Sequence, residues 1–198
     1  VYAGGRGLNT YTDASGEHYS ITAGTVDHNT YVVIKGGRVT RNVYGGGNIA
    51  SVGEYRNDES GNLVVVDGEY VPETGTGLAQ VTIKGGKIGV YNDDDLTHGN
   101  VFGSSHGLAG ALYKDLAYVH NTEVRLDSVA VVYGAVFGGG EDGHVNQHAL
   151  VSVNGNAVVG HENDVDSKGN VYGGGRGVDL DETQTPPVLS PTAGLVKG

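Results

Sequence analysis

The chain has 198 residues, a net charge of −11 and 36 glycines, and it contains no cysteine, methionine or tryptophan. The absence of cysteine excludes disulfides and thiolate metal sites, and the acidic charge argues against nucleic-acid binding, which favours a basic surface. With only 4 prolines and apolar residues spread along the whole chain, collagen and simple disorder are both disfavoured. No segment reaches the roughly 18 apolar residues of a membrane span, so none is expected.

The first recurring element is an aliphatic and an aromatic residue followed by small residues. It occurs as VYAGG at 1–5, VYGGG at 43–47, VFGSS at 101–105, VFGGG at 136–140 and VYGGG at 171–175. Such recurrence is typical of repeat architectures in which each unit packs on its neighbours. We therefore expect an aromatic ladder, which either packs against the core and loops or forms a sugar- or partner-binding stripe. Its expected members are Tyr2, Tyr44, Phe102, Phe137 and Tyr172.

A second pattern, x-V-x-[ILV]-x-x-x-x-[VI], precedes each internal copy of the first. It occupies 31–39, 80–88, 123–131 and 150–158, and the four segments align without gaps. The alternation predicts a strand with one buried face, followed by a corner and a second short strand. The expected inward residues are Val32, Ile34 and Val39; Val81, Ile83 and Ile88; Val124, Leu126 and Val131; and Val151, Val153 and Val158.

Three segments depart from this pattern. In 62–71, the pair Asp67-Gly68 is a strong two-residue turn signal, so we predict a β-hairpin there, within an insertion over about 52–79, rather than a further coil. Residues 18–26 fit the strand pattern loosely. Apolar residues at helical spacing within 107–119 allow either one short helix or a loop packed across the coils.

Together these elements predict an all-β chain, a parallel β-solenoid (β-helix) of about four to six irregular coils with inserted loops and a hairpin. A βαβ fold would need a helix in every unit, and a sandwich would show evenly spaced hairpin turns. We expect residues 1–178 to form the solenoid domain and residues 179–198, with three prolines, to form a strap or linker. Residues 1–8 match residues 171–178 at six of eight positions, so we expect either a piece of a longer array or end-to-end stacking.

The pairing of a VYGGG-type element with a T-x-V-x-I-x-G-G-x-V element resembles the β-solenoid repeat regions of large bacterial surface and adhesin-like proteins. The resemblance covers most of residues 1–175, with departures at Ser104, Ser105 and the glycine-free corner Ser128-Val129. It implies a non-enzymatic structural or adhesive module of an extracellular fibre or cell-surface protein. The implied partners are neighbouring repeats, a second copy, or a host or microbial glycan or protein.

Two acidic loops are candidate calcium sites because this cation prefers several oxygen ligands. A solvated loop is the competing interpretation, and in the second loop Lys168 stands where a ligand is expected. No other metal and no cofactor is expected. The candidate ligands are Asp93, Asp94 and Asp95 in the first loop, and Asp164 and Asp166 in the second.

Catalytic patterns are weak. His144 and His148, with Glu141 nearby, have a metal-pair spacing only if they lie on a helix, and we expect two exposed loop histidines instead. The glycine clusters at 4–7 and 173–177 lack the Lys-Ser/Thr of a phosphate-binding loop. Parallel β-helices also include lyases and glycosidases, so the alternative function is a carbohydrate-binding or polysaccharide-degrading β-helix protein. We expect no enzyme, because no row of carboxylates occurs at the outward positions Val33, Thr82, Arg125 and Ser152.

Overall fold

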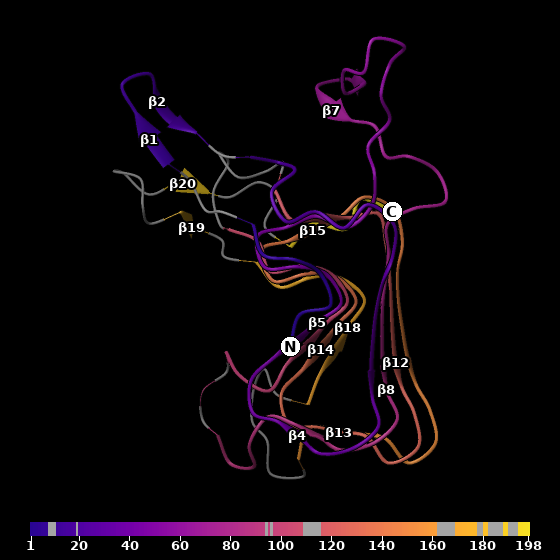
Figure 1. The fold of residues 1–198 in the computed structure, drawn as a ribbon. Helices are drawn as coiled ribbons and strands as arrows, with labels where there is room; N and C mark the ends of the chain where they lie inside the picture. Colours follow the sequence, from indigo (N-terminus) through magenta and orange to yellow (C-terminus); the bar gives the residue numbers. More distant parts are fainter. Residues whose placement is uncertain are drawn as a thin grey trace.

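The computed structural model describes residues 1–7, 11–18, 20–93, 95, 97–108, 116–161, 169–177, 180–181, 188–189 and 194–198. Over these residues the chain forms strands, turns and irregular segments without a helix, so the all-β prediction is confirmed for them. In the same residues no helix is present that could cross a membrane. Figure 1 shows segments far apart in the sequence running side by side along nearly the same path.

Three parallel four-stranded sheets form the body, and each takes one strand from each of four successive units. We call the strands contributed by one unit a layer. The first sheet contains β3 (Thr30–Ile34), β8 (Leu78–Ile83), β12 (Asn121–Leu126) and β16 (Ala149–Val153). The second contains β4 (Arg38–Val39), β9 (Lys87–Ile88), β13 (Val131–Val132) and β17 (Val158–Val159). The third contains β5 (Val43–Tyr44), β10 (Val101–Phe102), β14 (Val136–Phe137) and β18 (Val171–Tyr172). Within every sheet the spatial order follows the chain order, so like strands stack on like strands.

A further column of paired segments completes each layer. β11 (Tyr118–Val119) pairs in parallel with β15 (His144–Val145), and isolated bridges join Val26 to Val52 and Val52 to Val119. Val196 continues the column by bridging to Val145, so the end of the predicted strap stacks on the preceding layer. β19 (Leu180–Asp181) pairs antiparallel with β20 (Val188–Leu189), and the rest of 178–193 lies outside the described residues. The domain boundary at 178 stays a prediction.

The hydrophobic core lies between the three sheets, because the alternating residues of the long strands point there. The predicted inward residues Val81, Ile83, Val124 and Leu126 are fully buried. They pack with Val43, Val101 and Val136 of the third sheet in one cluster. Val153, by contrast, is 44% exposed, because β16 is the last strand of its sheet.

The gapless alignment of the second pattern is wrong in its last part. Val132, not Val131, lies beside Ile88, and Val159, not Val158, lies beside Val132. The corner in the third and fourth units holds four residues, whereas in the first two it holds three. Because side chains alternate along a strand, this one-residue shift moves Val131 and Val158 out of the core positions that Val132 and Val159 take.

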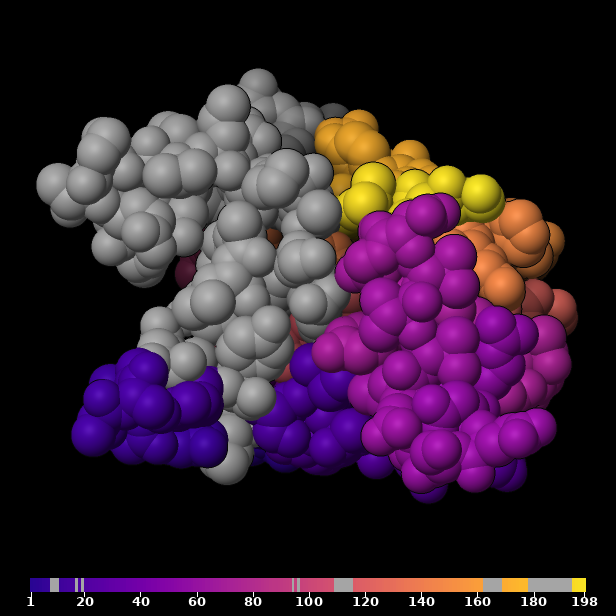
Figure 2. All heavy atoms as spheres, turned by 90° about the horizontal axis from the view of Figure 1, so that it is seen from above, coloured from indigo at the N-terminus to yellow at the C-terminus, as the bar shows by residue number. Residues whose placement is uncertain are grey.

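The predicted hairpin in the insertion is confirmed. β6 (Val65–Val66) pairs antiparallel with β7 (Glu69–Tyr70), and the turn residues Asp67 and Gly68 have φ of 53° and 83°, as a type I′ turn requires. The hairpin projects from the stack in Figure 1. In Figure 2 the insertion (magenta) lies against the C-terminal residues (yellow), where the Lys197 ammonium donates to Glu69.

Other segments differ from the expectations. An unpredicted hairpin forms from β1 (Tyr11–Asp13) and β2 (Gly16–His18). Within 18–26, His18 belongs to β2, residues 21–24 form a turn, and Val26 is bridged to Val52. Residues 109–115 of the candidate helix lie outside the described residues, and its end is strand β11.

Candidate functional site

The predicted aromatic ladder is present on the outer face of the third sheet. In β5, β10 and β14 the valine points into the core, so the aromatic residue that follows points the other way. The rings stack in register, with interplanar angles between 4° and 11°. Centroid separations are 4.6 Å for Tyr2–Tyr44, 5.0 Å for Tyr44–Phe102, 4.9 Å for Phe102–Phe137 and 4.9 Å for Phe137–Tyr172.

The inner part of the ladder is covered. Tyr44, Phe102 and Phe137 are 4%, 0% and 7% exposed, whereas the end rings of Tyr2 and Tyr172 are 42% and 40% exposed. The interpretation as packing against adjoining segments therefore holds for the three inner rings. A ligand can reach only the ends.

The glycine after the aromatic residue is required at Gly45, Gly103 and Gly138 by the close approach of successive layers. A Cβ at Gly45 would lie 2.2 Å from the carbonyl oxygen of Gly103, and one at Gly103 would lie 2.2 Å from that of Gly138. Real Cβ atoms essentially never come within 3.0 Å of another heavy atom, so only glycine fits. The first glycine of the motif is kept even where Ser104 and Ser105 replace the other two.

The departure at Ser105 is itself explained by the structure. Its hydroxyl accepts a hydrogen bond from Gly47 N at 2.9 Å and donates to Ala50 O at 2.7 Å, and the residue is fully buried. A Cβ on Gly46 would lie 2.2 Å from this hydroxyl oxygen. The serine therefore occupies the space that Gly46 leaves and satisfies two buried backbone groups.

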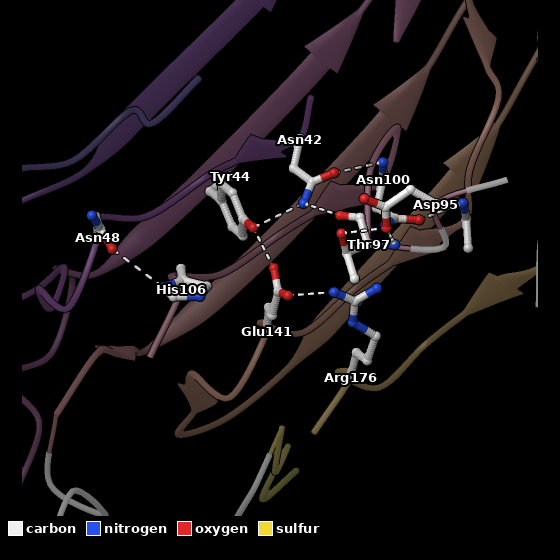
Figure 3. Close-up of polar contacts among 10 residues, drawn as sticks. Asn42, Tyr44, Asn48, Asp95, Thr97, Asn100, His106, Glu141 and Arg176 are labelled. Atoms are coloured by element: carbon white, nitrogen blue, oxygen red, sulfur yellow. Dashed lines mark hydrogen bonds and ion pairs between the residues drawn. The ribbon is translucent and has the colours of Figure 1, made fainter. Parts of the chain in front are cut away.

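A half-buried ionic cluster contacts the ladder at Tyr44 (Figure 3). The Tyr44 hydroxyl and the Arg176 guanidinium donate to the two carboxylate oxygens of Glu141. The guanidinium also lies 5.3 Å from the centroid of Phe102, a cation–π distance. Burial, and after it the charge of Glu141, raises the pKa of Tyr44, so the phenol stays neutral and acts as a donor. Both oxygens of Glu141 are engaged, which suits a structural role better than acid–base chemistry.

Asparagines that precede the motif connect the layers. Asn42 Oδ1 accepts from Asn100 N at 2.9 Å, and Asn100 Oδ1 accepts from Ala135 N at 2.8 Å. Asn42 Nδ2 also donates to the Tyr44 hydroxyl at 3.1 Å and to Thr97 O at 2.8 Å. Sequence reasoning missed this role, although asparagine precedes three of the four internal motif copies.

A cavity of about 300 Å³ opens beside the Tyr2 end of the ladder. Tyr2, Asn42, His106 and Glu141 are among its lining residues. His106 Nδ1 lies 3.2 Å from Asn48 Oδ1, so Nδ1 carries a proton and donates, and the ring meets Tyr44 edge-on. An aromatic face beside polar groups is the chemistry that a saccharide unit requires.

The candidate calcium ligands that the structure describes, Asp93 and Asp95, form hydrogen bonds and ion pairs within their own loop. Asp95 Oδ1 accepts from Thr97 N at 2.8 Å, and Asp93 Oδ1 accepts from Asp95 N at 3.1 Å. Both carboxylates also face His98, at 3.2 Å from Asp95 and 3.7 Å from Asp93. Within the described residues no group of three or more His, Asp or Glu side chains could hold a metal ion. Asp94, Asp164 and Asp166 lie outside those residues, so calcium binding stays a prediction.

The expectation of two exposed loop histidines is wrong for His144. This residue is buried in β15, and its ring centroid lies 4.8 Å from that of Tyr118 in β11. Stacking of β15 on β11 encloses the ring. His148 is exposed, as expected.

The outward positions of the first sheet form the row that the alignment predicted. Val33, Thr82, Arg125 and Ser152 lie in register. Glu123 is a carboxylate of the adjacent row, and it accepts hydrogen bonds from Gln80 and Arg125. Burial alone would raise the pKa of Glu123, but the hydrogen bonds and the charge of Arg125 outweigh it and lower the pKa. A carboxylate held ionised in this way is a poor general acid.

Comparison with known proteins found no match: no protein-family model, no curated protein and no solved structure matched the chain. The function must therefore be argued from the stack, the ladder and the cavities themselves.

Proposed function

We propose that the chain is a parallel β-solenoid module with a structural or adhesive role in a bacterial extracellular fibre or cell-surface protein. The observation that carries the proposal is the in-register stacking of all three sheets together with a ladder of five aromatic rings along the stack. In such an architecture each layer contacts only its neighbours, so length grows by adding layers. That property suits a stalk or fibre.

The chemistry of the described residues favours a non-enzymatic role. Glu141 and Glu123 are the carboxylates at the two sites above, and both are already bound by cationic and neutral donors. The resemblance to repeat regions of bacterial surface proteins and the absence of cysteine favour an extracellular location. Its partners would then be neighbouring repeats or a second copy of the chain, together with a glycan or protein of the host or of another microbe.

The alternative is a carbohydrate-binding or polysaccharide-degrading β-helix protein, and the cavity beside Tyr2 favours it. Incubation with polysaccharides, followed by measurement of reducing ends, separates the two. Release of reducing ends that is lost in the variant Glu141→Gln or Glu123→Gln would replace the structural proposal with an enzymatic one.

The structural proposal is tested on the bacterium that produces the protein. Antibodies against the purified chain should label intact cells, and electron microscopy of the complete protein should show rods. Each added layer should lengthen the rod by about 4.8 Å, the spacing of paired strands. Labelling only after lysis would contradict the surface location, and compact particles of the complete protein would contradict the stalk.

A further inference from the structure

A second cavity lies where the insertion meets the first sheet. It has a volume of about 380 Å³, within the typical range of ligand pockets, which is roughly 300–1,000 Å³. Residues 72–76 of the insertion form one wall, and residues at the start of the stacked strands form the other. The cavity shares no lining residue with the cavity beside Tyr2.

Side-chain amides from successive layers line this cavity, and the backbone fixes their orientation. The N–H of Leu78 donates to Asn29 at 2.8 Å, so the contacting atom of Asn29 is Oδ1 and its NH₂ group is a donor. Asn121 Oδ1 accepts from His148 N at 3.3 Å, and Asn121 Nδ2 donates to Gln147 Oε1 at 2.8 Å. Among the described residues, the NH₂ groups of Asn29 and Gln147 have no protein acceptor. Two oriented donors are therefore available to a ligand.

His120 supplies a buried acceptor in the same cavity. The residue is 2% exposed, and its Nδ1 lies 3.3 Å from Thr76 O. A carbonyl can only accept, so Nδ1 carries the proton and Nε2 is the acceptor of the neutral ring. A Cβ on Gly53 or Gly77 would collide with the Nδ1 side of the ring, so backbone closes that side. Burial lowers the pKa of His120 against the opposing effect of the Thr76 bond, which keeps the ring neutral.

The charge and the surroundings of the cavity define the class of ligand. Among the described residues no lysine or arginine lines the cavity, and Glu73 adds a carboxylate that accepts from Thr74 N at 3.0 Å. An anionic ligand is therefore disfavoured. Tyr31, on the same outward face two residues after Asn29 and so about 7 Å away, is 59% exposed and offers an aromatic surface.

We infer that this cavity binds a neutral saccharide, whose hydroxyl groups accept from the amides of Asn29 and Gln147 and donate to His120 and Glu73. Hydroxyl groups both donate and accept, so they match a wall that presents both kinds of partner. The inference rests on the adhesive part of the proposed function, for which it names the ligand class and the site.

The test is a titration of the ¹⁵N-labelled chain, followed by NMR, with neutral oligosaccharides built from glucose, mannose, galactose or xylose. At least one should shift the side-chain amide signals of Asn29 and Gln147 at about 10 mM, ten times a weak Kd of about 1 mM. The acidic polymer polygalacturonate should leave them unchanged. Absence of shifts with every neutral oligosaccharide, or shifts with polygalacturonate alone, would overturn the inference.

Two variants and a matched control locate the binding. Gln147→Ala should weaken it about tenfold, the loss of one well-placed hydrogen bond. Asn154→Ala removes an exposed amide just beyond the other end of β16 and should leave Kd within twofold. Thr74→Trp, in the exposed wall of the cavity, should abolish binding while the backbone spectrum stays folded.

Equal affinity in Gln147→Ala and Asn154→Ala would place the saccharide elsewhere and overturn the assignment. Rod formation and surface labelling do not depend on the cavity. Rods without saccharide binding would therefore remove this inference alone, whereas compact particles would remove the structural proposal.

Discussion

Replacing Gly103 by alanine should destabilise the chain strongly, whereas the same change at Gly173 should not, although both follow the aromatic residue of the motif. A Cβ at Gly103 would lie 2.2 Å from the carbonyl oxygen of Gly138, but one at Gly173 would meet no atom of the described residues within 4 Å. Ordinary contact begins near 3.4 Å. Two layers would therefore have to separate by about 1 Å at Gly103.

The expected magnitude follows from this separation. Overpacking of a tight interior costs about 1–3 kcal/mol. The shift also stretches the hydrogen bond from Gly103 N to Phe137 O, now 2.9 Å, and the bond from Ser104 N to Gly139 O, now 3.2 Å, each worth about 1 kcal/mol. We expect a loss of about 2–5 kcal/mol for Gly103→Ala. Gly173 does not have a positive φ, so Gly173→Ala should be neutral or stabilise by up to about 1 kcal/mol through the unfolded chain.

Urea denaturation followed by circular dichroism measures both variants against the unsubstituted chain. The slope of free energy against urea should be unchanged, because neither substitution alters the surface exposed on unfolding. If Gly103→Ala unfolds within about 0.5 kcal/mol of the unsubstituted chain, the close approach of the layers does not explain the glycine.

Three further predictions concern the ladder, the buried serine and the buried histidine. Phe102→Ala should cost about 3–5 kcal/mol and the end-ring variant Tyr172→Ala less than about 1.5, and equal losses in thermal melts would contradict a stacked ladder. Ser105→Ala should lower the free energy of unfolding, measured in urea, by about 1–3 kcal/mol, and it should speed hydrogen exchange at the Gly47 amide, which donates to the serine hydroxyl. Unchanged exchange at Gly47 would contradict the assigned hydrogen bond. Burial lowers the pKa of His120, so below its ordinary pKa of about 6.5 the unfolded chain binds more protons than the folded one. Stability should therefore fall as the pH drops below about 6.5, by at most about 1.4 kcal/mol per pH unit. His120→Asn, which keeps a donor for Thr76 O, should flatten this part of the plot of urea midpoint against pH. An unchanged plot would contradict the assignment of the pH dependence to His120.

The ladder, the outward row and the inserted hairpin could be predicted because each has a strong local signal. Recurrence of the motif places like residues beside each other once units stack in parallel. Asp67-Gly68 is a turn whose positive φ values few other pairs accept. The hairpin at 11–18 has Ala14-Ser15 at its turn, which is not a strong turn signal, so this hairpin was not predicted.

The register of the second sheet could not be read from the pattern, for a physical reason. In the third and fourth units the strand is a pair of valines, so either residue satisfies an apolar position. Ile88 and Val39 have no such apolar neighbour in their strands, because Lys87 and Arg38 precede them. Only the pairing of strands across layers decides which valine faces the core.

The buried polar groups escaped prediction because their partners are distant in the sequence. Glu141 meets Tyr44, 97 residues away, and Asn42 meets Asn100, 58 residues away. His144 lies in a two-residue strand, too short for alternation to reveal burial. Such contacts follow from stacking, so they become predictable only when the layer register is known.

Each of the three residue types in the motif has its own structural role, and the residues that form the stack differ from those of segment 54–76 that line the cavities. The valine fills the core, the aromatic residue extends the ladder, and the glycine admits the next layer. None of the residues in the core clusters belongs to segment 54–76, which forms walls of the cavity at Asn29 and of another beside Asp27. Substitutions in this segment can therefore change what the cavities bind while leaving the stack intact, as expected of a scaffold whose inserted loops carry specificity.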